Sequence, residues 1–198
     1  MPLQERTLES GILCTYHDEP ADAPSADHWT VLEQTTALIP AEHRPLVARV
    51  ELRAHGESPA SGGGSDREAR RIRLSHASLR ATYNQRQNAT LLHEWGHHVD
   101  WHYNVAGWVA GQGENGRTFL QTGHDGATQG PEERVADCYM IYLIQVVAGR
   151  NYVHMADREA YRGNAARMRF DLLLRSPAFP PMAEVAAEPA PAAAAAAP

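Results

Sequence analysis

The alternation of apolar and polar residues along the first third of the chain predicts a short helix followed by a strand. Residues 28–38 carry apolar side chains at helical spacing, and Pro40 follows where such a helix would have to stop. Residues 46–53 alternate from Ala48 onward, with charged neighbours on either side of Val50 and Leu52. A period of two is typical of a strand with one face buried.

A second alternating segment, Arg71–Ser75, predicts another short strand with Ile72 and Leu74 facing inward and its arginines facing solvent. The preceding segment 57–65 contains three consecutive glycines near its end. We expect it to be a flexible surface loop, because glycine loses more conformational entropy on ordering than other residues. It does not match a phosphate-binding loop, since no Gly-Lys-Ser/Thr ending opens a helix here.

A helix is expected to begin a few residues before Asn88, because Thr82 and Gln85 have the spacing of a capping box. Apolar residues then recur along one side of it: Leu91, Leu92, Trp95 and Val99. Three residues with chemically active side chains fall on an adjacent face: His93, His97 and Asp100. Core packing and chemistry are therefore assigned to different faces, and Trp95 and Trp101 are expected to be core residues.

The glycine-rich segment 105–130 predicts a long irregular loop, which in a compact domain is usually functional or mobile. Residues 131–148 then predict a helix, with proline at its first position and Gly149 after its end. This helix is apolar almost all round, so we expect it to be buried. Glu133 and Asp137 share one of its faces, and burying two carboxylates without partners would be costly.

A last amphipathic helix is expected over residues 157–174. Beyond Ser176 the chain is mostly proline and alanine, which cannot bury enough surface to offset the entropy of ordering. We therefore expect one α+β domain over residues 1–176 and a disordered tail over residues 177–198, since 198 residues leave little room for two full domains.

The charge of the chain excludes some partners. A formal net charge of −6 without a clustered basic surface argues against nucleic-acid binding. No segment has the ~20 apolar residues of a membrane span, and the first residues lack an apolar signal-peptide core. We expect no membrane association, and a location in the cytoplasm or release without a cleaved signal peptide. Cys14 and Cys138 are too few for a disulfide framework, and two free thiols are expected.

The most informative motif is His93-Glu94-Trp95-Gly96-His97. Positions i and i+4 of a helix lie on one face, so both imidazoles can bind one metal ion. Glu94 is then placed to take a proton from a metal-bound water, as in zinc metalloproteases. Two buried core histidines would be the alternative. His98 and His102 lie off this face and are expected to be solvated or packing residues.

A catalytic zinc needs a third protein ligand and an open fourth position. A third histidine, as in the extended form of the motif, would require Gly at position 100 and His at position 103, where this chain has Asp100 and Tyr103. Glu133 is the preferred candidate, because Asp137 one turn later could accept the free ring N–H of a ligand histidine. Glu132 points about 100° away and ranks second. Asp100 either supports the ligands or stabilises a local loop.

This combination resembles the gluzincin superfamily of zinc metallopeptidases, in which His-Glu-x-x-His is followed downstream by Glu-x-x-x-Asp or Glu-x-x-x-Glu on another helix. Here the second part stands as Glu133 to Asp137. The first helix is most similar to that of the lethal-factor and Pro-Pro endopeptidase branch. The likeness covers the two helices and is local. It implies one zinc ion bound by His93, His97 and Glu133, with Glu94 as general base.

The resemblance also implies a mixed sheet whose edge strand pairs with extended substrate, a role expected for Arg71–Ser75. A tyrosine or histidine usually stabilises the oxyanion in this family. His124 is our first candidate for that role, followed by Tyr103 and Tyr139.

The expected function is a zinc-dependent endopeptidase acting on a peptide or protein. An amidase acting on cell-wall peptides and a non-catalytic, zinc-stabilised binding module are the alternatives. The sequence does not separate the two enzymes, whereas the intact Glu94 argues against a purely structural zinc site.

Overall fold

The fold is built on a mixed five-stranded sheet. The structure, a computed structural model, describes residues 3–17, 23–53, 63–75, 87–121, 130–150 and 168–179. The strand order is β1-β2-β3-β5-β4. Its members are β1 (Leu3–Thr7), β2 (Leu13–His17), β3 (Arg49–Arg53), β4 (Gly63–Asp66) and β5 (Arg71–Ser75). The two outer pairs, β1 with β2 and β4 with β5, are antiparallel, and the central pairings of β3 with β2 and β5 are parallel.

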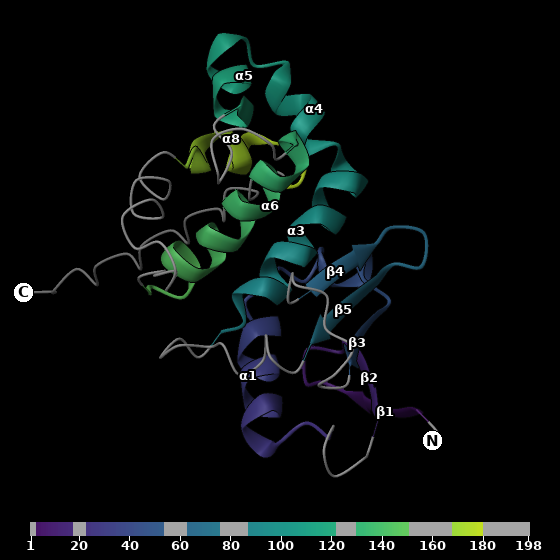
Figure 1. The fold of residues 1–198 in the computed structure, drawn as a ribbon. Coiled ribbons are helices and arrows are strands. Elements are labelled where there is room, and N and C mark those ends of the chain that lie inside the picture. The colour runs from purple at the N-terminus through teal and green to yellow at the C-terminus, as the bar shows by residue number, and fades with distance from the viewer. Residues whose placement is uncertain are drawn as a thin grey trace, which may run out of the picture.

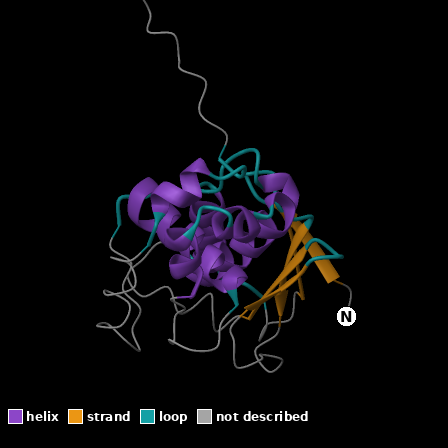
Figure 2. Ribbon diagram, turned by 90° about the horizontal axis from the view of Figure 1, so that it is seen from above, coloured by secondary structure: helices purple, strands orange, loops and turns teal. Residues whose placement is uncertain are grey.

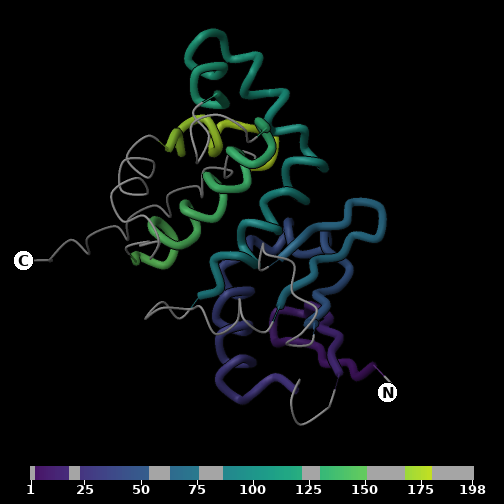
Figure 3. The backbone as a smooth tube through the Cα atoms, viewed as in Figure 1, coloured from purple at the N-terminus to yellow at the C-terminus, as the bar shows by residue number. Residues whose placement is uncertain are grey.

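The helices gather on one side of this sheet (Figure 2). The parallel pair β2 and β3 is connected through α1 (Ala26–Thr36) and a short 3₁₀ turn, η1 (Arg44–Leu46). The strands come from the earlier part of the chain and most of the helical layer from the later part (Figures 1 and 3). The α+β class expected from the sequence is confirmed.

Strands β3 and β5 show why the sheet has two different faces. Val50 is paired with Ile72, Leu52 is paired with Leu74, and these apolar side chains are buried. On the opposite face the Glu51 carboxylate forms ion pairs with Arg71 at 3.3 Å and with Arg73 at 3.5 Å. The arginines expected to face solvent therefore form an ion-pair network across the outer face, and the Arg71 side chain is only 16% exposed.

Two expectations about this sheet are corrected. Arg71–Ser75 is not an edge strand, because β4 pairs with it on the side away from β3. Within the described residues the strand at this edge of the sheet is β4, and β1 forms the other edge. β4 is the end of the segment expected to be a loop. Glycines do not produce an apolar alternation, so the sequence pattern carried no signal for this strand. The strand β1 is exposed along its whole length, so its sequence has no alternation of buried and exposed residues that would predict a strand.

The motif helix is α3 (Ala89–Tyr103), and it begins where Asn88 accepts a hydrogen bond from the Leu91 N–H at 2.8 Å. Asn88 is therefore the capping residue. The capping box expected at Thr82 and Gln85 lies outside the described residues. The expected apolar stripe of α3 is fully buried against the sheet and α6. The N-terminal helix is confirmed as α1, about two residues earlier than predicted.

Helix α6 (Pro131–Tyr142) continues into a π-helical turn, η2 (Leu143–Val147), and is buried along most of its length as predicted. It crosses α3 closely, because Gly96 faces Ala136. A Cβ placed on Gly96 would lie 2.7 Å from the Ala136 Cα. This approach of two small residues brings the motif helix and the Glu133-bearing helix together.

The expected long loop after α3 is instead largely helical. Asn104, in the left-handed conformation with φ 51°, ends α3 and is followed by α4 (Val105–Ala110) and α5 (Glu114–Gln121). Val109, Phe119 and Leu120 are buried and hold these short helices against the core. Tertiary packing thus overrides the low helix propensity of a glycine-rich segment. Residues 122–129 lie outside the described part of the chain.

The C-terminal end of the described chain also packs on the core. Helix α8 (Phe170–Arg175) buries Leu172 and Leu173, and most of the helix expected over residues 157–174 lies outside the described residues. Ala178 is fully buried, and its carbonyl oxygen accepts a hydrogen bond from the His43 Nε2 at 2.7 Å. The ordered core therefore extends beyond the boundary expected at Ser176.

Two further expectations concern the cysteines and membrane-spanning helices. Cys14 and Cys138 are both buried free thiols, and burial raises the pKa of each to about 12. Among the described residues, no helix combines the length and the apolar character that a membrane span requires.

Candidate metal centre

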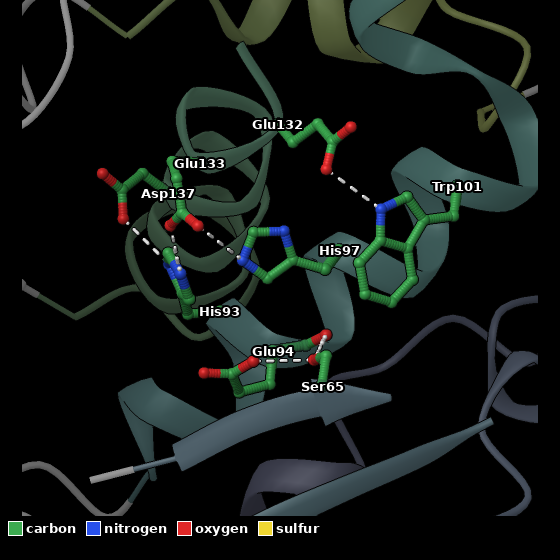
Figure 4. Close-up of polar contacts among 8 residues, drawn as sticks. All are labelled: Ser65, His93, Glu94, His97, Trp101, Glu132, Glu133 and Asp137. Atoms are coloured by element: carbon green, nitrogen blue, oxygen red, sulfur yellow. Dashed lines mark hydrogen bonds and ion pairs between the residues drawn. The ribbon is translucent and has the colours of Figure 1, made fainter. Parts of the chain in front are cut away.

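Three of the predicted residues converge at the crossing of α3 and α6. One ligand atom from each of His93, His97 and Glu133 lies within 4.8 Å of the others. Glu133 faces both imidazoles: its Oε2 is 3.1 Å from the His93 Nε2, and its Oε1 is 3.4 Å from the His97 Nε2 (Figure 4). The structure therefore brings together the three residues that the sequence singled out from two separate helices.

The separations fit a metal ion. Ligand atoms held about 2.1 Å from one zinc ion in tetrahedral geometry lie about 3.4 Å from each other. The Nε2-to-oxygen distances of 3.1 and 3.4 Å are close to that spacing. Two imidazoles and a carboxylate are also a common donor set of catalytic zinc. The donor set and the spacing of His93, His97 and Glu133 therefore fit a zinc ion.

Asp137 lies behind the cluster, as predicted. Its Oδ1 is 2.9 Å from the His93 Nδ1, and its side chain is 7% exposed. A carboxylate in this position accepts the Nδ1 proton, so the Nε2 lone pair is turned toward the centre. Asp137 therefore fixes both the tautomer and the orientation of this histidine.

Hydrogen bonds within the cluster shift the pKa values of its members. Burial lowers the pKa of His93, but the hydrogen bonds to Asp137 and Glu133 outweigh it and raise the value to about 10. The same hydrogen bonds from His93 and His97 hold the pKa of Glu133 well below its usual range. The carboxylates of Glu133 and Asp137 therefore favour a proton on His93. A divalent cation bound at the cluster can replace that proton and balance the same negative charge.

Glu94 lies beside the cluster and not in it. Its Oε2 accepts a hydrogen bond of 2.6 Å from the Ser65 hydroxyl, which also lies 3.0 Å from the Glu94 backbone oxygen (Figure 4). Ser65 is on the edge strand β4, and the sequence analysis missed it. The only available signal was the run of glycines before it, which allows a strand to approach a helix.

The close approach of β4 is visible at Gly63. A Cβ on this residue would lie 2.6 Å from the Thr90 Cγ2 and 3.3 Å from the Glu94 Oε1. Glycine is therefore required where the edge strand passes the motif helix. The described end of the segment expected to be a surface loop, Gly63–Ser65, is instead part of a strand that contacts Glu94.

Trp101 and Glu132 form a second contact between α3 and α6. The indole N–H of Trp101 donates a hydrogen bond of 3.1 Å to the Glu132 Oε2, and its ring stacks on His97 with centroids 5.6 Å apart. Glu132, the second candidate for the third ligand, is therefore engaged elsewhere. Trp101 was expected in the core and instead packs beside the cluster.

Asp100 has a local role. Its Oδ1 accepts a hydrogen bond of 2.6 Å from the Ala106 N–H, so it holds the start of α4. Of the two roles expected for Asp100, support of the ligands or stabilisation of a local loop, this contact corresponds to the second. The reason is the left-handed turn at Asn104, which folds the chain back over the end of α3.

Two of the three candidates for an oxyanion stabiliser, Tyr103 and Tyr139, pack around His43 and not at the cluster. Tyr139 is fully buried, and its hydroxyl is 3.0 Å from the His43 Nδ1. Tyr103 packs its ring against His43 and His102. His124 lies outside the described residues. His98 is buried and His102 is exposed, and neither belongs to the cluster, as predicted.

Comparisons of the chain with protein-family models, with curated proteins and with solved structures each found no match.

Proposed function

We propose that this protein is a zinc-dependent peptidase of the gluzincin type, with an endopeptidase activity. The observation that carries the proposal is the convergence of His93, His97 and Glu133 from two helices. The general base candidate Glu94 lies next to the first of them. Asp137 adds the supporting carboxylate that zinc-binding histidines commonly have.

The ligands, Glu94 and Ser65 have different roles in the proposed hydrolysis. His93, His97 and Glu133 would hold the zinc ion, which when bound would act as a Lewis acid and lower the pKa of a coordinated water toward ~7. The Glu94 carboxylate takes a proton from the attacking water. It then donates that proton to the amine nitrogen as the carbon–nitrogen bond breaks, so water is added across the peptide bond. The Ser65 hydroxyl orients the Glu94 carboxylate for both transfers.

The exposure of the cluster favours an enzyme over a structural zinc site. The side chains of His93 and Glu133 are 20% and 38% exposed, so solvent reaches the side of the centre that they share. A structural site would be closed by a fourth protein ligand. Among the described residues, the metal-ligating cluster contains three members. The proposal leaves the fourth position of the zinc to water or substrate, as a catalytic site requires.

The edge strand provides a place for the substrate. In the described part of the sheet β4 has a free side, and it runs past Glu94. An extended peptide added to this strand would lie over the centre, held by main-chain hydrogen bonds. We therefore assign to β4 the substrate-pairing role that the resemblance implied for an edge strand.

The proposal is tested by metal analysis together with an unbiased cleavage assay. We expect the purified protein to bind about one zinc per chain. It should cleave members of a peptide library, lose that activity on chelation and regain it with added zinc. A library of branched cell-wall peptides run in parallel tests the amidase alternative. Protein without affinity for zinc, or cleavage that persists after complete metal removal, would refute the proposal.

A further inference from the structure

A groove of about 620 Å³ lies between the C-terminal half of α3 and the β4–β5 turn. Its volume falls within the range of pockets that bind small ligands. These two elements contribute Arg67, Arg70, His98, Trp101, His102 and Tyr103, and Glu42 lines the groove from a third segment. The groove therefore combines aromatic walls with two guanidinium groups.

Trp101 connects the groove to the candidate metal centre. The same indole ring that lines the groove stacks on His97 at 5.6 Å. Its N–H is turned to Glu132 on α6, while its six-membered ring points away from that carboxylate (Figure 4). The edge strand leads to the same place, because β4 passes Glu94 at Ser65 and enters the turn that carries Arg67 and Arg70.

Hydrogen bonds and an ion pair hold the turn, and two of its arginines line the groove. Asp66 accepts a hydrogen bond of 3.0 Å from the Ala69 N–H, and its charge is balanced by Arg71 at 2.8 Å. Arg70 donates to the backbone carbonyl oxygens of Pro45 and Leu46. In the described part of the chain, Arg67 and Arg70 have no ion-pair partner.

Glu42 is the one carboxylate among the described residues that line the groove. Two guanidinium groups and one carboxylate therefore line the groove, so the lining itself is positively charged at neutral pH. An anionic group entering between the aromatic walls would gain both electrostatic attraction and directed N–H donors. The groove is thus complementary to an acidic side chain and not to a basic one.

We infer that this groove is a specificity subsite that binds an aspartate or glutamate side chain of the peptide substrate. Arg67 and Arg70 are its charge partners and Trp101 is its wall. The inference rests on the proposed peptidase function and adds to it a preferred class of substrate.

The test compares matched peptides on the zinc-loaded full chain. Peptides found in the library screen are remade with Glu, Gln or Lys at each position near the cleaved bond, all with amidated C-termini. We expect one position at which Glu is cleaved about 5- to 10-fold faster than Gln, measured as kcat/KM. The ratio does not depend on the fraction of active protein, so a partly unfolded variant still gives a valid result.

Two exposed residues of the groove can be changed in opposite directions. Arg67→Gln should lower the Glu-to-Gln ratio to below about 2, and Glu42→Gln should raise it above the parental value. Arg117→Gln is the matched control, since Arg117 is an exposed arginine on α5 that does not line the groove, and it should leave the ratio unchanged. The ratio should also shrink at 0.5 M salt.

Other outcomes overturn the inference while leaving the peptidase proposal intact. These are cleavage without a Glu preference at any position, a preference that Arg67→Gln does not reduce, and a preference that appears only for a free C-terminal carboxylate. Absence of cleavage of every peptide would overturn the peptidase proposal. In that case the groove is tested by binding of acetyl-Ala-Glu-Ala-amide and its Gln counterpart, followed by the indole N–H resonance of Trp101. Equal shifts with both peptides would overturn the subsite.

Discussion

Gly96 lies directly against Ala136, and this contact sets the distance between the two helices that form the candidate metal centre. A Cβ on residue 96 would lie 2.7 Å from the Ala136 Cα and 3.0 Å from its carbonyl oxygen. Both neighbours belong to the α6 backbone, so they cannot rotate away as a side chain could. The second variable position of the motif is therefore a packing residue, and the position of Glu133 relative to the two histidines depends on it.

Gly96→Ala should separate α3 from α6. We expect a loss of about 1–3 kcal/mol in the free energy of unfolding, which is typical of an overpacked core, measured by urea denaturation. Zinc affinity should fall as well, because Glu133 moves away from His93 and His97. Gly64→Ala is the control, since a Cβ on Gly64 meets no atom within 4 Å. Equal effects of the two substitutions would contradict the role of the helix contact.

Asp137→Asn should weaken zinc binding by about 10- to 100-fold, because an amide stabilises the Nδ1–H of His93 less well than a carboxylate does. The measurement is competition with a zinc-selective dye at constant pH. Asp171→Asn removes an exposed carboxylate on α8 and should leave zinc binding unchanged. Zinc affinity equal to the parent's in Asp137→Asn would show that this carboxylate does not support a ligand.

Ser65→Ala removes the hydroxyl that donates to Glu94. Zinc content should stay at the parental level, because Ser65 does not contact the cluster ligands directly, while kcat should fall about tenfold through poorer orientation of the carboxylate. Ser65→Thr, which keeps the hydroxyl, should recover part of the rate. If Ser65→Ala and Ser65→Thr were equally impaired, the loss would arise from strand packing and not from the hydrogen bond.

His43 predicts a pH dependence of stability. It is fully buried, and burial lowers its pKa below the ordinary 6.5 in spite of its backbone hydrogen bond to Ala178. The folded chain therefore binds this proton more weakly than the unfolded chain. The stabilisation is complete above about pH 6.5 and is lost as the pH falls below that value. Urea unfolding at pH 7.5 and 5.5 should show a smaller loss for His43→Gln than for the parent.

The control for this experiment is His17→Gln, which changes a partly exposed histidine at the end of β2, away from the groups that shift the pKa of His43. It should retain the parental loss of stability between the two pH values. If both variants lost as much stability as the parent, the pH dependence would come from other groups.

The parts of the structure that follow from local patterns were predictable. The face shared by His93 and His97 follows from helical spacing alone, and Glu133 could be preferred because a second carboxylate lies one turn later on a buried helix. Val50 and Leu52 were recognisable as inward-facing because alternation is a property of a single strand. Each of these inferences needs only residues that are close together in the sequence.

Features that depend on contacts between distant segments could not be predicted. Ser65 approaches Glu94 across 29 positions of the chain, and no pattern in the glycine-rich segment indicates which helix it will meet. The interior position of Arg71–Ser75 depends on the pairing with β4, and α4 and α5 depend on burial of a few apolar side chains. Trp101 looked like a core residue because helical periodicity does not distinguish a groove wall from a buried side chain.

The central claim is that Glu94 transfers the proton in a reaction at the centre formed by His93, His97 and Glu133. The most direct measurement is the rate of peptide cleavage by zinc-loaded Glu94→Gln, with zinc content determined on the same sample. We expect zinc binding like the parent's and a rate lower by about 10²- to 10⁴-fold, since glutamine cannot accept the proton. Parental zinc content together with a parental cleavage rate would contradict it.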